Sequence, residues 1–444
     1  LHFFPTRRSS DLQGKTTVFK AQLRILPSVA FISAFLNNTP VVVIFAPIIK
    51  HWAKSVNLPA TKFLIPLSYV TILGGICTLI GTSTNLVVHG MILEAGFEGF
   101  SMFELGKVGI FIAIAGIIYI FLFSKRLLPD ARPDTAVPDE EIEEGEKFHR
   151  VEAVLGARFP GINKKLKDFN FQRHYGAEVK EIKTRNGQRF VSNLEEVVLH
   201  EGDTLVVMAD DTFIPTWGES SVFVLLTNGN EPDTTGKKKR WFALLLLVLM
   251  IVGATVGELP ITKEMFPDIK LDMFFFVSIT TIIMAWTNLF PARKYTKYIS
   301  WDILITIACA FAISKAMVNS GVADSVAKFI IGLSDDYGPH VLLAMVFIIT
   351  NLFTELITNN AAAALAFPLA LSISAQLGVS PTPFFVVICM AASASFSTPI
   401  GYQTNLIVQG IGNYKFTDFV RIGLPLNIIT FLISIILIPL IWNF

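Results

Sequence analysis

Long apolar stretches recur along the chain and are separated by short polar segments. Most of them approach or exceed the roughly 20 residues that an α-helix needs to cross a bilayer. The pattern therefore predicts an all-α polytopic membrane protein. Its apolar stretches lie at about 62–92, 107–123, 241–259, 271–290, 301–318, 340–372, 383–410 and 422–443.

Polar residues interrupt two apolar runs in a similar way. One Asn pair stands in LNNTPVVVIFAP (36–47), and another stands in TNNAAAALAFP (358–368). A buried amide without a partner costs a few kcal/mol, and proline is well placed at the first position of a helix. We therefore expect a broken or re-entrant helix at each pair. In the first copy, one half-helix should end near Leu36 and another should begin at Pro40.

A second pair of interruptions follows the Asn pairs in the same order. The stretches GGICTLIGTSTN (74–85) and ASFSTPIGYQTN (394–405) are rich in glycine and hydroxyl groups. They lie 320 residues apart (405 − 85), and the Asn pairs lie 322 apart (359 − 37). Interrupted apolar segments at corresponding places in two halves predict a transporter built from two repeats, with its binding site at the breaks.

The composition supports this membrane assignment and sets one segment apart. Of the 444 residues, 52% are hydrophobic and 16% are charged, whereas soluble domains average about 25% charged residues. Between the apolar halves, short alternating runs and turns predict a small soluble α+β insert. The predicted division is a non-native or poorly ordered segment (1–20), a first transmembrane repeat (21–128), a linker (129–150), the insert (151–212), a second linker (213–240) and a second transmembrane repeat (241–444).

Basic residues indicate the orientation of the insert. Lys125 and Arg126 precede it, and Lys237 to Arg240 follow it. Because cytoplasmic loops carry an excess of Lys and Arg, 129–240 is predicted to lie in the cytoplasm. The first repeat has only 36 residues before its Asn pair, far fewer than the second. By symmetry, some three helices are absent from the front, so we expect the natural chain to extend further upstream.

The breaks supply uncharged ligands for two kinds of ion. Asn oxygens and freed backbone carbonyls suit an alkali cation, whereas amide N–H groups, the Thr39 hydroxyl and the positive end of a half-helix suit an anion. Ala361 stands where the first copy has Thr39, so the second copy lacks one hydroxyl. Asn pairs can also join helices, and Gly74 and Gly75 suit close helix packing.

Glu355 is an ionisable residue within an apolar stretch, four residues before Asn359 and aligned with Ser33. A carboxylate inside a membrane marks a functional site by default, here a cation ligand or a proton site. The alternative is a position near the membrane interface, where the carboxylate would cap a neighbour. Lys315 lies near the end of an apolar stretch, where it can extend its ammonium group to the interface.

Other chemistry finds no support in the sequence. A net charge of +1 indicates no partner class, and nucleic acid is not expected. Cys77, Cys309 and Cys389 are scattered, which excludes a disulfide framework or a metal-binding spacing. The seven His residues form no group, and neither a phosphate loop nor a nucleophile–base spacing occurs. We therefore predict that the protein is not an enzyme and has no cofactor.

The Asn motifs and the breaks IGTSTN and IGYQTN resemble those of the divalent anion/sodium symporters within the ion transporter superfamily. The ending TNLIVQGIGNYKFTDFVRIGLPLNII (404–429) is most like the branch that carries an insert between its halves and is often linked to sulfate. Within the insert, FPGINKKLKDFNFQRHYG followed by EGDTLVV resembles the TrkA-C (RCK-C) regulatory domain.

This resemblance implies re-entrant hairpins that bind Na⁺ and an anion at mid-membrane, with elevator-type alternating access in a homodimer. Na⁺ is implied as the coupling ion. The residues implied for the first Na⁺ site are Ser33, Asn37, Asn38 and Gly81, to which Asn85 is added. Those implied for the second are Glu355, Asn359, Asn360 and Gly401, to which Asn405 is added. The anion would contact Asn38, Thr39, Thr82, Asn360 and Gln403, next to Ala361.

The resulting functional prediction is sodium-coupled symport of a divalent oxyanion, with sulfate favoured. Loss of the second hydroxyl argues against a dicarboxylate, but a sodium- or proton-coupled dicarboxylate or citrate transporter is the first alternative. A regulated cation channel or channel subunit is the second alternative. It would need a carbonyl-lined filter such as TVGYG, which the sequence lacks. The insert could bind a soluble ligand that the sequence does not identify.

Overall fold

The structure, a computed structural model, describes most of the chain. Residues 1–16 of the segment expected to be non-native, and residues 131–147 of the first expected linker, lie outside the described residues. Thr17 caps a helix that begins at Val18. The described residues are 17–56, 58–130, 148–156, 158–184, 188–210, 213–217, 222–227, 237–257, 260–265, 271, 273–287, 289, 301–333 and 338–444.

The first repeat consists of helices that are interrupted at the predicted places. α1 ends at Ser33 and α2 begins at Asn38, so the break comes slightly before the expected Leu36 and Pro40. The apolar stretch 62–92 forms two helices with a second break between them. In chain order the elements are α1 (Val18–Ser33), α2 (Asn38–Ser55), a 3-10 turn (Ala60–Lys62), α3 (Leu64–Gly75), α4 (Ser83–Glu94) and α5 (Gly106–Leu127).

The second repeat has the same order of helices and breaks. α13 and α14 are separated at 357–358, and α15 and α16 are separated at 394–402. The elements are α8 (Lys237–Gly257), α9 (Pro260–Met265), α10 (Met273–Trp286), α11 (Trp301–Asn319), α12 (Val322–Leu333), α13 (Gly338–Leu356), α14 (Asn359–Leu377), α15 (Thr382–Ser393), α16 (Gln403–Gly412) and α17 (Phe416–Ile441).

Several helices have the length and composition of membrane spans. Within the described residues these are α5, α13, α14 and α17, and the pair α11 and α12, bent by 72°, is a further candidate. α5 and α17 expose apolar side chains along their length, as helices that face lipid do: Ile110, Ile114, Ile118, Leu424, Ile428 and Leu432. The predicted polytopic membrane fold with broken helices is confirmed.

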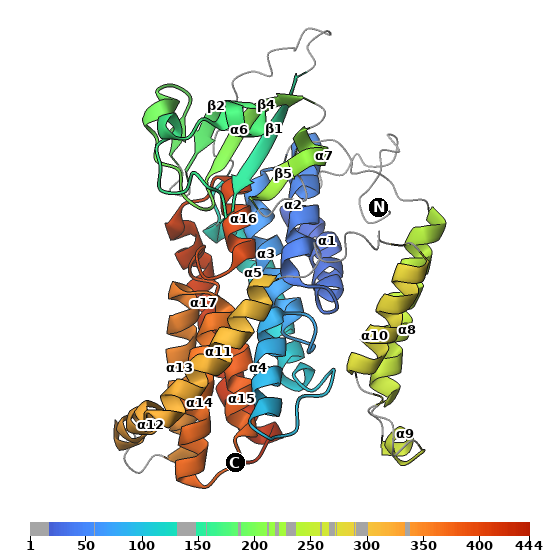
Figure 1. The fold of residues 1–444 in the computed structure, drawn as a ribbon, viewed down its shortest axis with the longest axis vertical. Helices are drawn as coiled ribbons and strands as arrows, with labels where there is room; N and C mark the ends of the chain where they lie inside the picture. Colours follow the sequence, from blue (N-terminus) through green and yellow to red (C-terminus); the bar gives the residue numbers. More distant parts are fainter. Residues whose placement is uncertain are drawn as a thin grey trace.

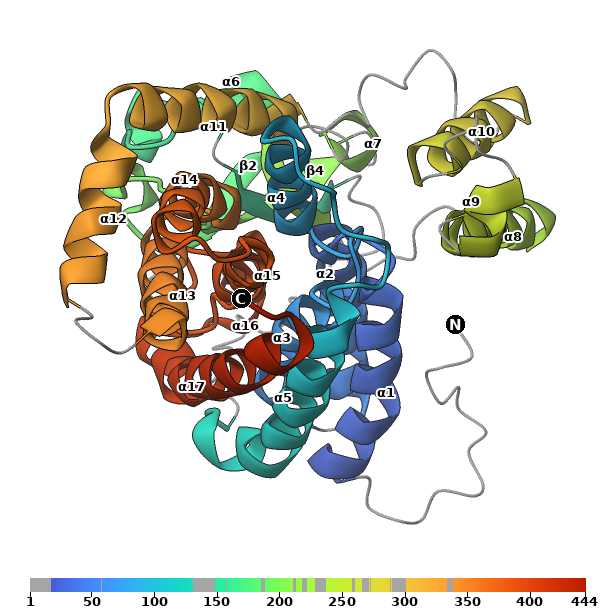
Figure 2. The ribbon, with the colours of Figure 1, turned by 90° about the horizontal axis from the view of Figure 1, so that it is seen from below.

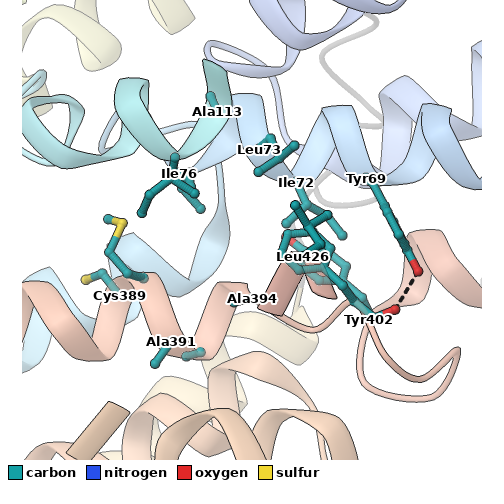
Figure 3. Close-up of a cluster of buried hydrophobic side chains, with 14 of the residues drawn as sticks. Tyr69, Ile72, Leu73, Ile76, Ala113, Cys389, Ala391, Ala394, Tyr402 and Leu426 are labelled. Atoms are coloured by element: carbon teal, nitrogen blue, oxygen red, sulfur yellow. Dashed lines mark hydrogen bonds between the residues drawn. The ribbon is translucent and has the colours of Figure 1, made fainter. Parts of the chain in front are cut away.

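Helices of the first repeat pack against helices of the second repeat. α2 packs against α16, α4 packs against α14, and α5 packs against α17. The pair α2 and α16 lies on the side of the molecule next to the insert, and the pair α4 and α14 lies on the opposite side (Figure 1). Seen from below, helices of both repeats surround a common centre (Figure 2). Tyr69, Ile72 and Leu73 of α3 lie there beside Leu426 of α17 (Figure 3). This packing brings the breaks of both repeats together.

The segment between the repeats forms an antiparallel sheet with the strand order β3-β2-β4-β1-β5. Aromatic side chains cover one face of the sheet: Phe159, Phe169, Phe171, Tyr175 and Phe223. The elements are β1 (Phe148–Leu155), a 3-10 turn (Leu166–Asp168), α6 (Phe171–Tyr175), β2 (Glu178–Lys183), β3 (Arg189–Phe190), a 3-10 turn (Leu194–Glu196), β4 (Thr204–Asp210), α7 (Phe213–Trp217) and β5 (Phe223–Thr227).

The predicted soluble α+β insert is thus confirmed, and it extends further along the chain than the sequence indicated. α7 and β5 fall in 213–240, which the sequence analysis assigned to a linker. The run FVLLT pairs with β1 from Glu152 to Leu155. In the sheet, β1 therefore lies between β4 on one side and β5 on the other.

The other face of the sheet contacts the transmembrane helices (Figure 1). Residues along a strand alternate between faces, so Glu152 and Val154 of β1 point away from the aromatic core. Val154 joins the core of the membrane repeats, and Glu152 forms an ion pair with Lys50 of α2 at 3.1 Å. Gly202 lies against Leu406 of α16, where a Cβ would approach the Leu406 side chain to 2.7 Å. The insert therefore contacts one helix from each repeat.

The ion pair at Glu152 gives a stability prediction. Burial alone would raise the pKa of Glu152, but Lys50 and Lys183 lower it from the usual 4.5 to about 2. The carboxylate therefore contributes stability above pH 4.5, and this contribution is lost as the pH falls towards 2. At pH 7, Glu152→Gln should destabilise the protein by about 1.5–3 kcal/mol and lower the Tm measured in detergent. The variant should also lose less stability than the natural chain on acidification.

Glu196→Gln is the matched control. The Glu196 carboxylate pairs with Lys165 and Lys167 on the exposed surface of the same insert, where water screens the pairs. The control should leave the Tm unchanged. An equal fall in Tm for both variants would contradict a specific role for the contact between the insert and α2.

Candidate functional site

Four helices begin at the centre of the molecule. Their first residues are Asn38 of α2, Ser83 of α4, Asn359 of α14 and Gln403 of α16. A helix N-terminus carries unpaired N–H groups and a partial positive charge. The N-cap residues of α4, α14 and α16 make no side-chain capping hydrogen bond. At these three helix starts, therefore, no N-cap side chain occupies the first N–H groups, although Asn405 N of α16 donates to the Tyr402 carbonyl at 3.0 Å.

Asn38 is the central residue of the first break. Its side chain is fully buried, Ser33 Oγ donates to its Oδ1 at 2.8 Å, and its Nδ2 donates to the hydroxyl of Tyr402. Gly75 makes room for it, since a Cβ at that position would lie 2.6 Å from Asn38 Oδ1. One amide thus joins α1, α2 and the second break of the other repeat.

The second repeat contains the same hydrogen bond, but its residues are shifted by one position from the pairing made in the sequence analysis. Thr354 Oγ1 donates to Asn359 Oδ1 at 3.0 Å, as Ser33 does to Asn38. Asn359 is therefore the counterpart of Asn38, and Glu355 is the counterpart of Ala34, which corrects the pairing of Glu355 with Ser33. The offset is 321 residues (359 − 38). Pro47 and Pro368, which lie inside α2 and α14, have the same offset.

Two threonines that the sequence analysis missed hold the breaks in shape. Thr78 Oγ1 donates to the backbone oxygen of Ala34 and accepts from Gly81 N at 3.1 Å. Thr398 Oγ1 donates to the backbone oxygen of Glu355 at 2.9 Å and accepts from Gly401 N at 3.4 Å. The shared pattern Thr-x-Ile-Gly, present as TLIG and TPIG, was the available signal.

Asn85 and Asn405 complete the matching pattern. Asn85 Nδ2 donates to the Thr78 carbonyl at 2.9 Å, and Asn405 Nδ2 donates to the Thr398 carbonyl at 3.1 Å. Ser68 donates to Asn405 Oδ1 at 2.7 Å. Asn85 Oδ1 is buried without a hydrogen-bond partner among the described residues, so this oxygen is free to coordinate a cation.

The two repeats also contact each other across the centre. Thr39 Oγ1 donates to Gln403 Oε1 at 3.3 Å. In the reciprocal position, Ser83 Oγ and Thr84 Oγ1 lie 3.3 Å from Asn360 Oδ1, to which they donate. The start of α2 therefore meets the start of α16, and the start of α14 meets the start of α4.

Tyr402, a polar residue of the predicted break at 394–405, also lies at this crossing. Its hydroxyl accepts from Asn38, lies 3.1 Å from Thr82 Oγ1 and also interacts with the side chain of Asn359. Thr82 is its counterpart in the first repeat (402 − 82 = 320). The Tyr402 phenol thus interacts with the first residue of α2 and with the first residue of α14, one from each repeat.

Glu355 lies in the last turn of α13, next to the break between α13 and α14. Its Oε1 accepts from Ser397 N at 2.9 Å and from Asn427 Nδ2 at 2.7 Å. Its Oε2 is buried without a hydrogen-bond partner in the described part of the chain. Asn427 belongs to α17 and carried no signal in the sequence analysis. The contacts bury the carboxylate among donors and leave one oxygen open.

Three predicted residues contribute less than the others. Asn37 is exposed in the first break, and Lys315 is exposed on α11. Ala361 is half-buried in the first turn of α14. It aligns with Pro40 at the observed offset, so Asn360, and not Ala361, stands opposite Thr39. The second repeat therefore has an amide where the first has a hydroxyl.

The arrangement provides ligands for a cation and an anion together. Within the described residues, no group of three or more His, Cys, Asp or Glu could hold a metal ion. The oxygens offered are amide, hydroxyl and backbone oxygens with one carboxylate, a set that suits a weakly held hard cation. The donors offered are amides and helix N-termini, which suit an oxyanion.

The chain is similar to known transporters. The family model for citrate transporters matches residues 15–376 and 269–444. An uncharacterized transporter of Synechocystis sp. is 30% identical over 93% of this chain and 81% of its own length. Sodium/sulfate cotransporter 2 of Chlamydomonas reinhardtii is 31% identical over 63% of this chain and 31% of its own length.

A human relative adds a match over a shorter region. Solute carrier family 13 member 4 of Homo sapiens is 25% identical over 35% of this chain and 24% of its own length. These matches confirm the family resemblance predicted from the Asn motifs, although they do not test the TrkA-C resemblance of the insert. With its broken helices and its site at their convergence, the chain belongs to the citrate transporter family and is a multi-pass membrane transporter.

Proposed function

We propose that the protein is a sodium-coupled symporter of a divalent oxyanion, with sulfate as its substrate. The observation that carries the proposal is the meeting of four helix N-termini at Asn38, Ser83, Asn359 and Gln403, surrounded by uncharged oxygens. Relatives named as sodium/sulfate cotransporters support both the cation and the anion.

The charge of the site matches a doubly charged anion. Each helix N-terminus is equivalent to roughly half a positive charge, so four of them present about two charges to one ligand. Thr39, Asn360 and Gln403 lie at these helix starts and supply hydroxyl and amide donors to the substrate oxygens. This arrangement neutralises the anion through dipoles, which favours binding without a strong ion pair that would slow release.

The cation sites lie beside the anion, one in each repeat. We assign Ser33, Asn38, Gly81 and Asn85 to the first site, with Asn37 at its edge. Glu355, Asn359, Asn360, Gly401 and Asn405 form the second. A Na⁺ ion at each site would offset the carboxylate of Glu355 and raise the affinity for the anion, which is the physical basis of coupling.

A small tetrahedral anion fits these donors better than a citrate. Thr39 has Asn360 as its counterpart, so the two repeats offer one hydroxyl and one amide. The described residues bring no Lys or Arg side chain to the site, whereas a tricarboxylate would need compensation for three charges. The match to the citrate transporter family favours a dicarboxylate or citrate as the alternative substrate.

Further features of the transporter belong to the same proposal. The homodimer, the elevator-type movement, the cytoplasmic position of 129–240 and a soluble ligand at 151–212 stay predictions. The contacts of the insert with Lys50 and Leu406 support a regulatory role for such a ligand, because both side chains belong to helices that start at the site.

Removal of the central amides should abolish coupled transport. Asn38→Ala and Asn360→Ala should each lower Na⁺-dependent uptake of radiolabelled sulfate into proteoliposomes by at least about tenfold. A lost hydrogen bond to a charged group is worth about 1.5–3 kcal/mol, and 1.4 kcal/mol is a factor of ten. Uptake is measured with and without an inward Na⁺ gradient.

Asn319→Ala is the matched control, because Asn319 ends α11 with an exposed side chain. It should transport like the natural chain. Full uptake by both Asn38→Ala and Asn360→Ala, in protein that reconstitutes normally, would remove the site assignment.

Competition should identify the substrate. Unlabelled sulfate in tenfold excess should suppress uptake of labelled sulfate by most of its value, whereas succinate and citrate should leave it nearly unchanged, because the site lacks cationic side chains for carboxylates. Uptake of each labelled anion is measured in parallel at one Na⁺ gradient. Strong inhibition by succinate or citrate, with their own Na⁺-dependent uptake, would favour the carboxylate transporter instead.

A further inference from the structure

Tyr402 and Thr82 occupy the same place in the two repeats. Each residue directly precedes a helix that starts at the site, α16 or α4, and each has an extended backbone, with φ and ψ of −129° and 128° at Tyr402 and −139° and 144° at Thr82. Neither side chain caps its own helix. Because the first repeat forms this break with a small hydroxyl residue, the phenol of Tyr402 in the second repeat needs a separate reason.

The phenol reaches the other three helix starts. Its hydroxyl accepts a hydrogen bond from Asn38 Nδ2 of α2 and lies 3.1 Å from Thr82 Oγ1, directly before α4. It also interacts with the side chain of Asn359, the first residue of α14, and Tyr402 itself precedes α16. One hydroxyl therefore lies between the starts of all four helices, where their partial positive charges come together.

The polar residues at these helix starts form two layers. The side chains of the buried layer are at most 8% exposed: Asn38, Thr82, Asn359 and Tyr402. The accessible layer consists of the residues that follow each of them in the chain: Thr39, Ser83, Asn360 and Gln403. In this second layer Gln403 is exposed and the other three are half-buried. The phenol therefore lies beneath the side chains that a ligand from solvent would meet first.

The phenol also takes up groups that would otherwise bind an anion. The sequence analysis assigned Asn38 and Thr82 to the anion, but in the structure Asn38 Nδ2 donates to the phenol and the Thr82 hydroxyl contacts it. The side-chain donors left to a ligand are those of the accessible layer, with the first N–H groups of the helices. This smaller set suits one compact oxyanion.

We propose that Tyr402 determines the size of the anion: its phenol closes the buried side of the site, so that a tetrahedral oxyanion such as sulfate fits and a dicarboxylate does not. The inference rests on the proposed function and deepens it, because it names the residue that selects the substrate class. Succinate also carries two charges, but it carries them on carboxylates at the two ends of a carbon chain. The second carboxylate would need the space and the donors that Tyr402 occupies.

Tyr402→Thr gives the second repeat the residue of the first and tests this role. It removes the ring and frees Asn38 Nδ2 and Thr82 Oγ1 for a second carboxylate. In proteoliposomes with an inward Na⁺ gradient, the variant should take up labelled succinate at least about tenfold faster than the natural chain, the effect of one hydrogen bond to a charged group. Excess succinate should also suppress its uptake of labelled sulfate. Citrate should stay excluded, because the variant gains no positive charge for a third carboxylate.

Tyr402→Phe separates the ring from its hydroxyl. The ring stays, so succinate should remain excluded, while Asn38 Nδ2 loses its acceptor and sulfate uptake should fall by up to about tenfold. Because Phe fills nearly the same space, this variant tests the inference even where removal of the ring lowers the yield of folded protein. Tyr119→Phe is the matched control: it removes the hydroxyl that donates to the Ile422 carbonyl at 3.1 Å between α5 and α17. It should transport sulfate like the natural chain and exclude succinate.

The uptake of the two anions decides between the explanations. Sulfate uptake by Tyr402→Thr with succinate still excluded would overturn the inference and leave the proposed function intact. Succinate uptake by Tyr402→Phe equal to that by Tyr402→Thr would also overturn it, because the hydroxyl and not the ring would then select the substrate. Na⁺-dependent uptake of succinate but not of sulfate by the natural chain would overturn both the inference and the proposed function.

Discussion

Backbone N–H groups at four interrupted helices are the constraint on which the rest of the structure depends. In a bilayer each polar backbone group needs a partner, because lipid offers none. A helix that starts at mid-depth leaves its first N–H groups unpaired. The chain tolerates this by bringing all four starts to one place, where they face the polar side chains of the other repeat. The packing of α2 against α16 and of α4 against α14 follows from this requirement.

The breaks are held by a small set of hydrogen bonds that occurs twice. In each repeat, a threonine bonds the end of the preceding hairpin helix and the glycine three residues later, and an asparagine bonds the carbonyl of that threonine. Glycine is required beside these bonds: a Cβ at Gly401 would lie 2.1 Å from the Thr354 carbonyl. Backbone and side chain thus satisfy each other locally at the second break of each repeat.

Much of this could be predicted from the sequence because the polar residues stand out against an apolar background. The breaks, the two repeats and the insert were identified from residue type and spacing alone. The pairing of Glu355 with Ser33 was wrong by one residue, since the Asn pairs were aligned by letter and their hydrogen bonds were unknown. The contacts of Tyr402 and Asn427 were not predicted, because they join segments that lie far apart in the chain. β5 was missed because a single short apolar strand has no distinctive pattern.

The insert contacts α2 and α16, two helices whose first residues lie at the site. α2 and α16 carry Asn38 and Gln403 at one end, and at the other end they carry Lys50, which pairs with Glu152, and Gly410, which abuts Thr204. The two helices pack against each other along their length. Separation of their site ends would strain the contacts with β1 and β4 or move the sheet with one helix. The soluble insert therefore contacts both helices whose first residues lie at the site.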